Sequence, residues 1–250
     1  MTKPTFLSYE QPPLTCMVQA KTPERIKDLM ARAEGADAFG MQFCRMMPEY
    51  RTKEIYRELF SLASPLPTYV TNYRYGYNEG KSDDELAEGI LELADCGATL
   101  CDVMGDLFDK QDDELARDVS AIERQMKLID ELHAKGAEVL MSSHVFKFTP
   151  AERVLEIALE HKRRGADIAK IVTGASSMEE QLENLRIVHL LKAELGIPFL
   201  FLANGESRIL RRVGGSLGNC MTLCVVEYDD LATKSQPLLS EMKTLRDLLG

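Results

Sequence analysis

A lysine inside a short apolar run is the first residue whose position suggests chemistry. Lys170 lies in DIAKIVT, residues 167–173, which otherwise reads as a buried strand. Burying a lysine is costly, because removal from water disfavours the ammonium form. The neutral amine attacks ketones and aldehydes to form an imine, whose protonated form draws electrons from the neighbouring carbon. A structural lysine paired with an inward acid such as Asp102 is the alternative.

A histidine ends the apolar run before this one. His144 closes EVLMSSH, residues 138–144, and histidine transfers protons near neutral pH. A lone histidine after a strand is often an ordinary polar residue. A histidine and a lysine on neighbouring strand ends favour proton transfer next to an imine.

The elements that position these residues alternate along the chain. Apolar runs predict strands in residues 14–19, 37–43, 66–73, 98–104, 137–144, 167–173, 197–203 and 219–227. Amphipathic patterns and cap residues predict helices over 23–34, 50–63, 82–95, 112–135, 149–164, 177–195, 206–217 and 236–249. Eight such units in 250 residues favour an α/β fold, a closed parallel (β/α)8 TIM barrel.

The barrel predicts where the two chemical residues point. Alternate residues of a barrel strand face inward, so Ile168, Lys170 and Val172 share the inner face. Lys170 is therefore expected inside the barrel. His144 is expected at the carboxyl-terminal edge of the strands, where this fold has its active sites.

Composition limits the remaining classes of function. The absence of a linker or composition break predicts one domain over residues 1–250, with residues 1–12 covering the barrel bottom. A net charge of −10 disfavours nucleic acid as a partner. No apolar stretch of about 18 residues is present, so no membrane span is expected. The first residues lack an apolar signal region, which predicts a cytoplasmic protein.

The six cysteines are expected to be free thiols, most of them buried in a reducing compartment. A zinc site from Cys220 and Cys224 is the alternative, but their spacing does not match a zinc knuckle. Imine chemistry needs neither a metal nor a redox cofactor, and we expect neither.

The order and spacing of these motifs resemble the type I 3-dehydroquinate dehydratases, which form an imine (Schiff base) with their substrate. MSSHVFKFTP (141–150) resembles the family's strand-five histidine motif, and GADIAKIV (165–172) resembles its lysine motif. SRILRRVGGSLGNCMTL (207–223) is similar to its arginine–glycine segment. The likeness covers nearly the whole chain. It implies a lyase of the shikimate pathway, which serves aromatic amino acid biosynthesis.

The resemblance also implies roles for individual residues. Lys170 would form the imine, and His144 would be the general acid and base. Arg211 would bind the substrate carboxylate, where a solvated helix arginine is the alternative. Arg74 would bind substrate hydroxyls, where a rim salt bridge is the alternative. Glu79 would orient the histidine, where a solvated loop acid is the alternative.

Two further segments bear on substrate recognition. Thr233 and Gln236 in ATKSQPLL would replace the serine and match the glutamine of the family's mobile loop. In strand two the family carries a glutamate and an arginine two residues apart, where this chain has Gly40 and Gln42. Arg45 could replace that arginine only in a shifted register. Recognition of substrate hydroxyls therefore looks altered, while the imine chemistry looks retained.

Three functions follow from these residues. The first is dehydration of 3-dehydroquinate, or a close cyclic hydroxy-keto acid, to a conjugated product of the 3-dehydroshikimate type. The second is a class I aldolase, in which the imine on Lys170 leads to cleavage of a carbon–carbon bond. The third is a non-catalytic ligand-binding paralogue, which the retention of both Lys170 and His144 disfavours. A homodimer is compatible with the sequence, as is a role in the breakdown of quinate-like compounds.

Overall fold

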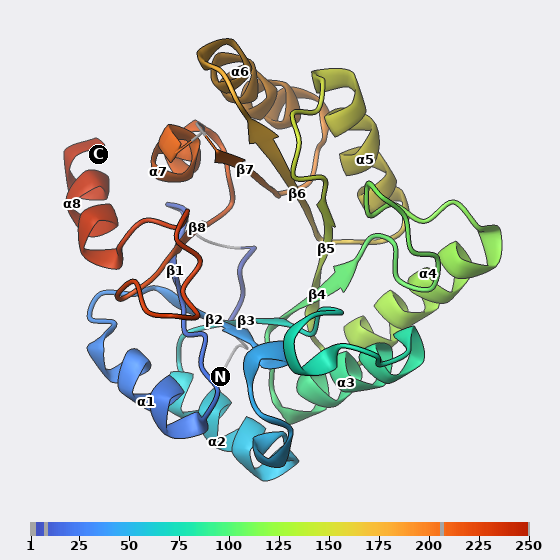
Figure 1. The fold of residues 1–250 in the computed structure, drawn as a ribbon, viewed down its shortest axis with the longest axis vertical. Helices are drawn as coiled ribbons and strands as arrows, with labels where there is room; N and C mark the ends of the chain where they lie inside the picture. Colours follow the sequence, from blue (N-terminus) through green and yellow to red (C-terminus); the bar gives the residue numbers. More distant parts are fainter. Residues whose placement is uncertain (1–3, 8–9, 206–207, 250) are drawn as a thin grey trace.

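The computed structural model describes residues 4–7, 10–205 and 208–249. These residues form a ring of parallel strands with helices outside it (Figure 1). The strands are β1 (Leu14–Met17), β2 (Ala38–Gln42), β3 (Thr68–Thr71), β4 (Leu100–Met104), β5 (Glu138–His144), β6 (Ile168–Ala175), β7 (Phe199–Gly205) and β8 (Thr222–Cys224). The α-helices are α1 (Pro23–Arg32), α2 (Lys53–Ala63), α3 (Asp83–Cys96), α4 (Val119–Ala134), α5 (Ala151–Arg163), α6 (Met178–Glu194), α7 (Arg208–Leu217) and α8 (Leu239–Leu249). The predicted α/β barrel of eight strand–helix units is confirmed.

The strands pair in the order β7-β6-β5-β4-β3-β2-β1-β8. Between β7 and β8 the described residues form no strand ladder, and the seam is bridged by residues just before β8. The Cys220 N–H donates to the Phe199 carbonyl at 2.8 Å. The side chain of Asn219 bonds both the N–H and the carbonyl of Phe201, at 2.8 and 2.9 Å. One asparagine thus replaces part of the missing ladder, and the predicted strand over 219–227 shortens to Thr222–Cys224.

Strand β6 alternates between the two sides of the barrel wall. Ile168 and Val172 belong to the cluster inside the barrel. Ala169 and Ile171 pack in the layer that includes residues of α5 and α6. This confirms the predicted alternation and directs Lys170 inward.

The predicted helix over 112–135 begins only at Val119. Asp118 caps that helix by accepting a bond from the Ala121 N–H at 2.9 Å. Before it, the carboxylate of Asp109 accepts from the N–H groups of Arg117 and Asp118 at 2.7 and 2.9 Å. Residues 105–118 therefore form a long loop between β4 and α4, since these side chains bond the backbone groups that a helix would use.

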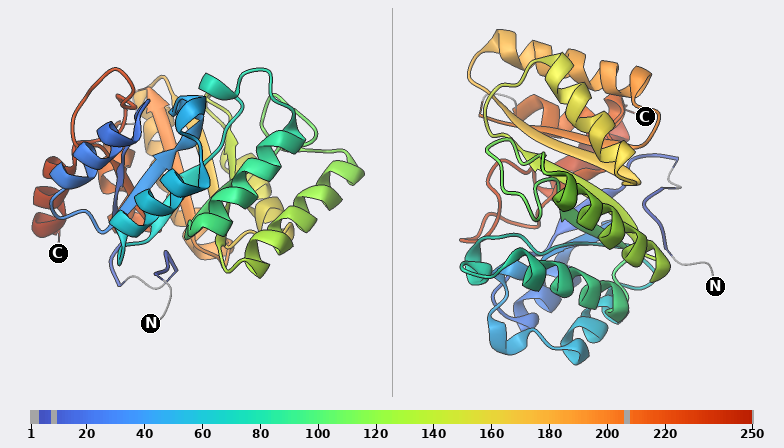
Figure 2. Two further views of the ribbon diagram at one scale, coloured as in Figure 1. Left: turned by 90° about the horizontal axis from the view of Figure 1, so that it is seen from below. Right: turned by 90° about the vertical axis from the view of Figure 1, so that its right-hand side faces the viewer.

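The N-terminal segment lies at one end of the barrel (Figure 2). Residues 1–3 and 8–9 of the segment predicted to cover the barrel bottom lie outside the described residues. Phe6 is buried in the inner cluster with Leu140 and Ile168, and its N–H donates to Glu138 at the start of β5 at 2.9 Å. These contacts support the predicted cover, and the single domain over residues 1–250 stays a prediction.

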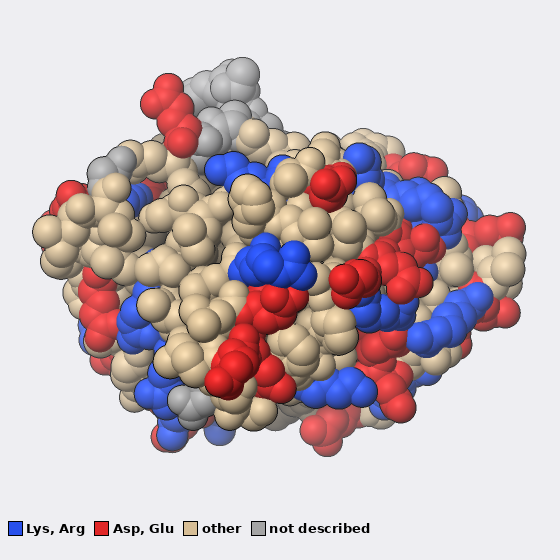
Figure 3. Space-filling view, turned by 90° about the horizontal axis from the view of Figure 1, so that it is seen from above, with Lys and Arg blue, Asp and Glu red and all other residues tan. Residues whose placement is uncertain are grey.

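The outer surface carries charges of both signs. On the face of α5 and α6, which is at the top of Figure 1, basic and acidic side chains lie next to one another (Figure 3). Pairs within single helices, such as Arg163 with Glu160 and Arg186 with Glu183, account for part of this pattern. None of the helices described is both long and apolar enough to cross a membrane.

Candidate active site

A cavity of about 530 Å³ opens at the carboxyl-terminal ends of the strands. Such cavities in this fold are lined by strand ends and by the loops that follow them. Of the predicted site residues, the lining includes Gln42, Arg74, His144, Lys170, Arg211, Thr233 and Gln236. Glu79 and Arg45 do not line it.

The amine of Lys170 lies in a buried polar cluster at the cavity wall. Its Nζ is 3.1 Å from Asp102 Oδ2, 2.6 Å from the Tyr73 hydroxyl and 3.0 Å from the Tyr69 hydroxyl. Burial raises the pKa of Asp102, but Lys170 and hydrogen bonds from Ser142 and the two tyrosines hold it below its usual value. Lys170 is therefore paired with Asp102, as expected of a structural lysine, and it also lines the cavity, as expected of a catalytic one.

Both phenols of this cluster donate to the same carboxylate oxygen, Asp102 Oδ2. Burial, followed by the charge of Asp102, raises the pKa of Tyr69 and of Tyr73 well above the usual value. Both hydroxyls are therefore protonated at neutral pH. The second carboxylate oxygen of Asp102 accepts from Ser142 at 2.6 Å.

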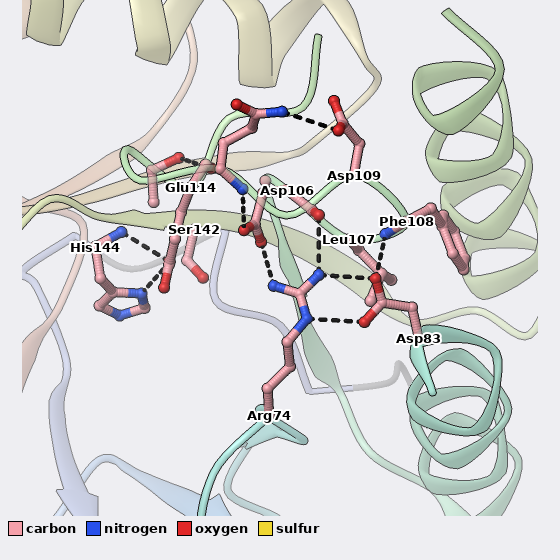
Figure 4. Close-up of polar contacts among 12 residues, drawn as sticks. Arg74, Asp83, Asp106, Leu107, Phe108, Asp109, Glu114, Ser142 and His144 are labelled. Carbon is pink, nitrogen blue, oxygen red and sulfur yellow. Dashed lines mark hydrogen bonds and ion pairs between the residues drawn. The ribbon is translucent and has the colours of Figure 1, made fainter. Parts of the chain in front are cut away.

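His144 is held by a glutamate from the β4–α4 loop. Its Nδ1 lies 2.7 Å from Glu114 Oε2, and the same oxygen accepts the His144 backbone N–H at 2.8 Å (Figure 4). The ring also packs against Tyr73 and Phe146, with centroid distances of 5.4 and 5.6 Å. Fixing Nδ1 leaves Nε2 for a ligand in the cavity, which is the arrangement of an oriented general base.

The position of Glu114 depends on close packing behind it. Its carbonyl accepts from Ser143 Oγ at 2.6 Å, and Ser143 in turn lies 3.0 Å from His161 Nε2. A Cβ on Gly105 would lie 2.5 Å from the Glu114 carbonyl oxygen. The loop can therefore approach β5 this closely only with glycine at position 105.

The geometry corrects the residue that orients the histidine. Glu79 follows the short 3-10 helix Gly76–Asn78, is exposed and does not line the cavity. The carboxylate in contact with His144 belongs to Glu114. The sequence alone shows Glu114 only as one of several acidic residues after the predicted strand over 98–104. It falls within the predicted helix over 112–135, where it would not be expected to reach His144.

Arg74 is engaged by two carboxylates at the cavity rim. Asp83 accepts from Nε and Nη2 at 2.8 and 2.9 Å, and Asp106 accepts from Nη1 through its carboxylate and from Nη2 through its carbonyl (Figure 4). Four of the five N–H groups of this guanidinium are thus used within the protein. The rim salt bridges that were the alternative role for Arg74 are present, and its fifth N–H has no partner among the described residues and could bind a ligand.

Arg211 is a buried cation that lines the cavity near the end of β7. It is 6% exposed and donates to the Ala203 carbonyl and the Asn204 side chain at 3.0 and 2.7 Å. Burial lowers its pKa to about 10. Among the described residues no carboxylate pairs with it, so an anionic ligand group would be stabilised here.

The strand-two side of the cavity is largely neutral. Gln42 Oε1 accepts from Arg45 Nε at 3.0 Å and from the Tyr75 hydroxyl at 3.2 Å. A Cβ on Gly40 would lie 2.1 Å from Met17 Sδ, so the thioether occupies the space of a side chain at position 40. Arg45 thus bonds Gln42 rather than lining the cavity.

The segment between β8 and α8 adds an acceptor. Gln236 is 4% exposed, and its Oε1 has no hydrogen-bond partner among the described residues. Thr233 accepts from Gln19 Nε2 at 3.4 Å. A substrate hydroxyl could bond Gln236 Oε1, because a buried oxygen without a partner is otherwise costly.

The described residues contain no group of three or more histidine, cysteine, aspartate or glutamate side chains placed to hold a metal ion. The pattern of the site is instead an amine, an oriented imidazole and a buried guanidinium around one cavity. Sequence reasoning did not assign roles to Glu114, Tyr69 or Tyr73. The sequence signals for the two tyrosines are weak: Tyr73 lies in the tyrosine-rich segment NYRYGYN, residues 72–78, and Tyr69 lies in the predicted strand over 66–73.

Comparison with known proteins gives relatives over the length of the chain. A family model described as type I 3-dehydroquinase matches residues 16–250. The 3-dehydroquinate dehydratase of Methanosarcina acetivorans is 32% identical over 209 residues, which cover 81% of this chain and 79% of the relative. That of Klebsiella pneumoniae is 30% identical over 147 residues, covering 58% and 57%. The match therefore spans little more than half of the Klebsiella protein.

Solved structures share the fold. The 3-dehydroquinate dehydratase of Geobacillus kaustophilus superposes with a TM-score of 0.80 at 18% identity, covering 97% of this chain and 93% of that one. The type I enzyme of Clostridium difficile gives a TM-score of 0.79 at 18% identity, covering 97% and 94%. At this identity the likeness establishes the fold, and the family follows from the sequence model. The chain belongs to the type I 3-dehydroquinase family.

Proposed function

We propose that this protein is a carbon–oxygen lyase that dehydrates 3-dehydroquinate, or a close cyclic hydroxy-keto acid, through an imine on Lys170. The observation that carries the proposal is one cavity lined by Lys170, His144 and Arg211. Membership of the family supports the same reaction. The reaction would belong to the shikimate pathway.

In the proposed reaction, Lys170 Nζ attacks the ketone carbon, and the carbonyl oxygen leaves as water. The resulting iminium acidifies the adjacent C–H. His144 takes that proton, and the electron pair forms the carbon–carbon double bond as the β-hydroxyl leaves. His144 returns the proton to that hydroxyl, so a second water is released. Hydrolysis of the iminium then frees the conjugated ketone and regenerates the amine.

Other residues would hold the substrate in this orientation. Arg211 binds the carboxylate, since a guanidinium matches two carboxylate oxygens. Gln236 Oε1 accepts a hydrogen bond from a substrate hydroxyl. Glu114 keeps the His144 ring aligned and stabilises its imidazolium form during proton transfer.

A product assay tests the function. The protein is incubated with 3-dehydroquinate, and absorbance of the conjugated ketone is followed together with product mass. We expect one product, lighter than the substrate by one water. Two carbonyl fragments would identify an aldolase, and saturable binding without product would identify a ligand-binding paralogue. Either result would overturn the proposal.

A further inference from the structure

The phenol of Tyr73 connects the reactive amine to the cavity. We propose that Tyr73 is a catalytic residue that relays protons between Lys170 Nζ and the substrate carbonyl oxygen as the imine forms and hydrolyses. The role rests on the proposed function, since it presupposes an imine on Lys170. It adds a proton-transfer group to the steps on either side of dehydration, in which the imine forms and is hydrolysed.

In the part of the chain that the structure describes, three groups bond or pair with Lys170 Nζ, and they differ in access to a ligand. Asp102 does not line the cavity, and its side chain has no exposed surface. It can balance the charge of the amine but cannot touch the substrate. Tyr69 and Tyr73 both contact the amine and line the cavity. A proton that passes between Nζ and a bound ligand must therefore use a phenol, an ordered water or the imidazole of His144.

The two phenols lie at different depths. Tyr69 is within β3 and belongs to the inner cluster with Leu140 and Ile168. Tyr73 comes after the end of β3, on the side of the barrel where the cavity opens, and its ring meets that of His144 edge-on. It is also the nearer to Nζ, at 2.6 Å against 3.0 Å. Tyr73 is thus the phenol between the amine and the substrate.

The proton balance of imine formation calls for such a relay. An ammonium carries three protons, and the iminium keeps one. The carbonyl oxygen leaves as water with the other two. When the carbon–nitrogen bond forms, Tyr73 accepts a proton from Nζ and gives its own to the oxygen. The same exchange accompanies cleavage of the carbon–oxygen bond, and the phenol ends each step unchanged.

The surroundings suit a relay better than a permanent base. Burial and the charge of Asp102 raise the pKa of Tyr73, so a lasting phenolate is disfavoured. Its proton rests on Asp102 Oδ2 and can turn toward a substrate oxygen by rotation about the phenol C–O bond. His144, held at Nδ1 by Glu114, is then left for proton transfer at carbon.

Oxygen exchange isolates this step from dehydration. In the His144→Ala background, the protein is mixed with 3-dehydroquinate in ¹⁸O-water. Entry of ¹⁸O into the ketone is measured above the rate without protein, and borohydride reduction with intact mass records the adduct. Tyr73→Phe and Tyr69→Phe are compared in that background, because both remove one phenol that bonds Nζ and Asp102. Thermal unfolding checks that each variant is folded.

We expect Tyr73→Phe to slow exchange on the order of 100-fold, as for loss of a general acid–base group, and Tyr69→Phe to slow it less than about tenfold. Equal exchange rates in Tyr73→Phe and its parent, or a larger loss in Tyr69→Phe, would overturn the relay while leaving the imine intact. Absence of adduct and exchange in the parent would overturn the proposed function, and the role of Tyr73 with it.

Discussion

The two sides of the cavity are built on different principles. On the β4–β6 side, Lys170 pairs with Asp102 and His144 bonds Glu114, and Tyr73 contacts both pairs through its hydroxyl and its ring. On the β1–β2 side, Gly40 offers no side chain, and Met17 fills the space beside it. One side can make and break bonds, whereas the other mainly shapes the cavity.

This difference separates reaction type from substrate recognition. Groups that form and use an imine must touch one another, so their positions are closely constrained. Groups that recognise ring substituents act one at a time and can be exchanged. Substitutions on the β4–β6 side should therefore affect turnover, while those on the β1–β2 side should act weakly and mainly on KM.

The largest effect in this comparison is expected from His144→Ala. Turnover should fall on the order of 10³-fold, because proton transfer at carbon loses its base. The borohydride-trapped adduct on Lys170 should persist. Steady-state kinetics and intact mass measure the two outcomes. A loss of turnover below tenfold would show that another group moves this proton.

The next largest effect is expected from Arg211→Gln, which tests the site proposed to bind the substrate carboxylate. Loss of its charged hydrogen bonds to the substrate should lower kcat/KM by about 100-fold, mostly through KM. Arg212→Gln is the matched control, because Arg212 pairs with Glu241 at the surface and should change kcat/KM less than about twofold.

The same site predicts a pH dependence. Since burial lowers the pKa of Arg211 to about 10, the guanidinium loses its charge as the pH rises through that value. KM for the carboxylate substrate should therefore rise above about pH 10 in the wild type. A KM that does not change up to pH 11, measured on protein still folded by circular dichroism, would contradict the assignment.

Glu114→Gln should lower kcat by about tenfold, because the amide orients His144 but stabilises its imidazolium less well. Glu79→Gln is the control with the same chemical change and should alter kcat less than about twofold. The pair is compared by initial rates at saturating substrate. A larger effect at Glu79 would restore the interpretation based on sequence spacing.

The smallest effect is expected on the β1–β2 side. Gln42→Ala should reduce kcat/KM by less than about fivefold, since Oε1 of Gln42 already accepts bonds within the protein. Initial rates over a range of substrate concentrations test this. A loss comparable to that of Arg211→Gln would abolish the distinction between the two sides.

The fold was predictable because its signals are local. The capping box at Ser82 and Glu85 is present as its residue types indicate, and alternation along β6 placed Lys170 inside the barrel. The start of α4 was not predictable from pattern, because charged and apolar residues continue as in a helix through 112–118. Side chains of Asp109 and Asp118 set that boundary.

Some site residues could be predicted from local sequence signals and others could not. The positions of Lys170 and His144 at the cavity follow from their places on the predicted strands. Glu114 reaches His144 only because the loop packs on Ser143, far along the chain. The contact between Tyr73 and Lys170 joins residues 97 positions apart. It depends on how the strands close around the barrel, and residue spacing within a single strand does not predict it.

The central claim is an imine between Lys170 and the substrate ketone. It is tested most directly by adding borohydride to the protein with 3-dehydroquinate and recording intact mass, followed by peptide mapping, with Lys170→Met alongside. The account predicts a reduced adduct on Lys170 in the wild type and none in the variant. Folded wild-type protein without an adduct, or an equal adduct in Lys170→Met, would contradict it.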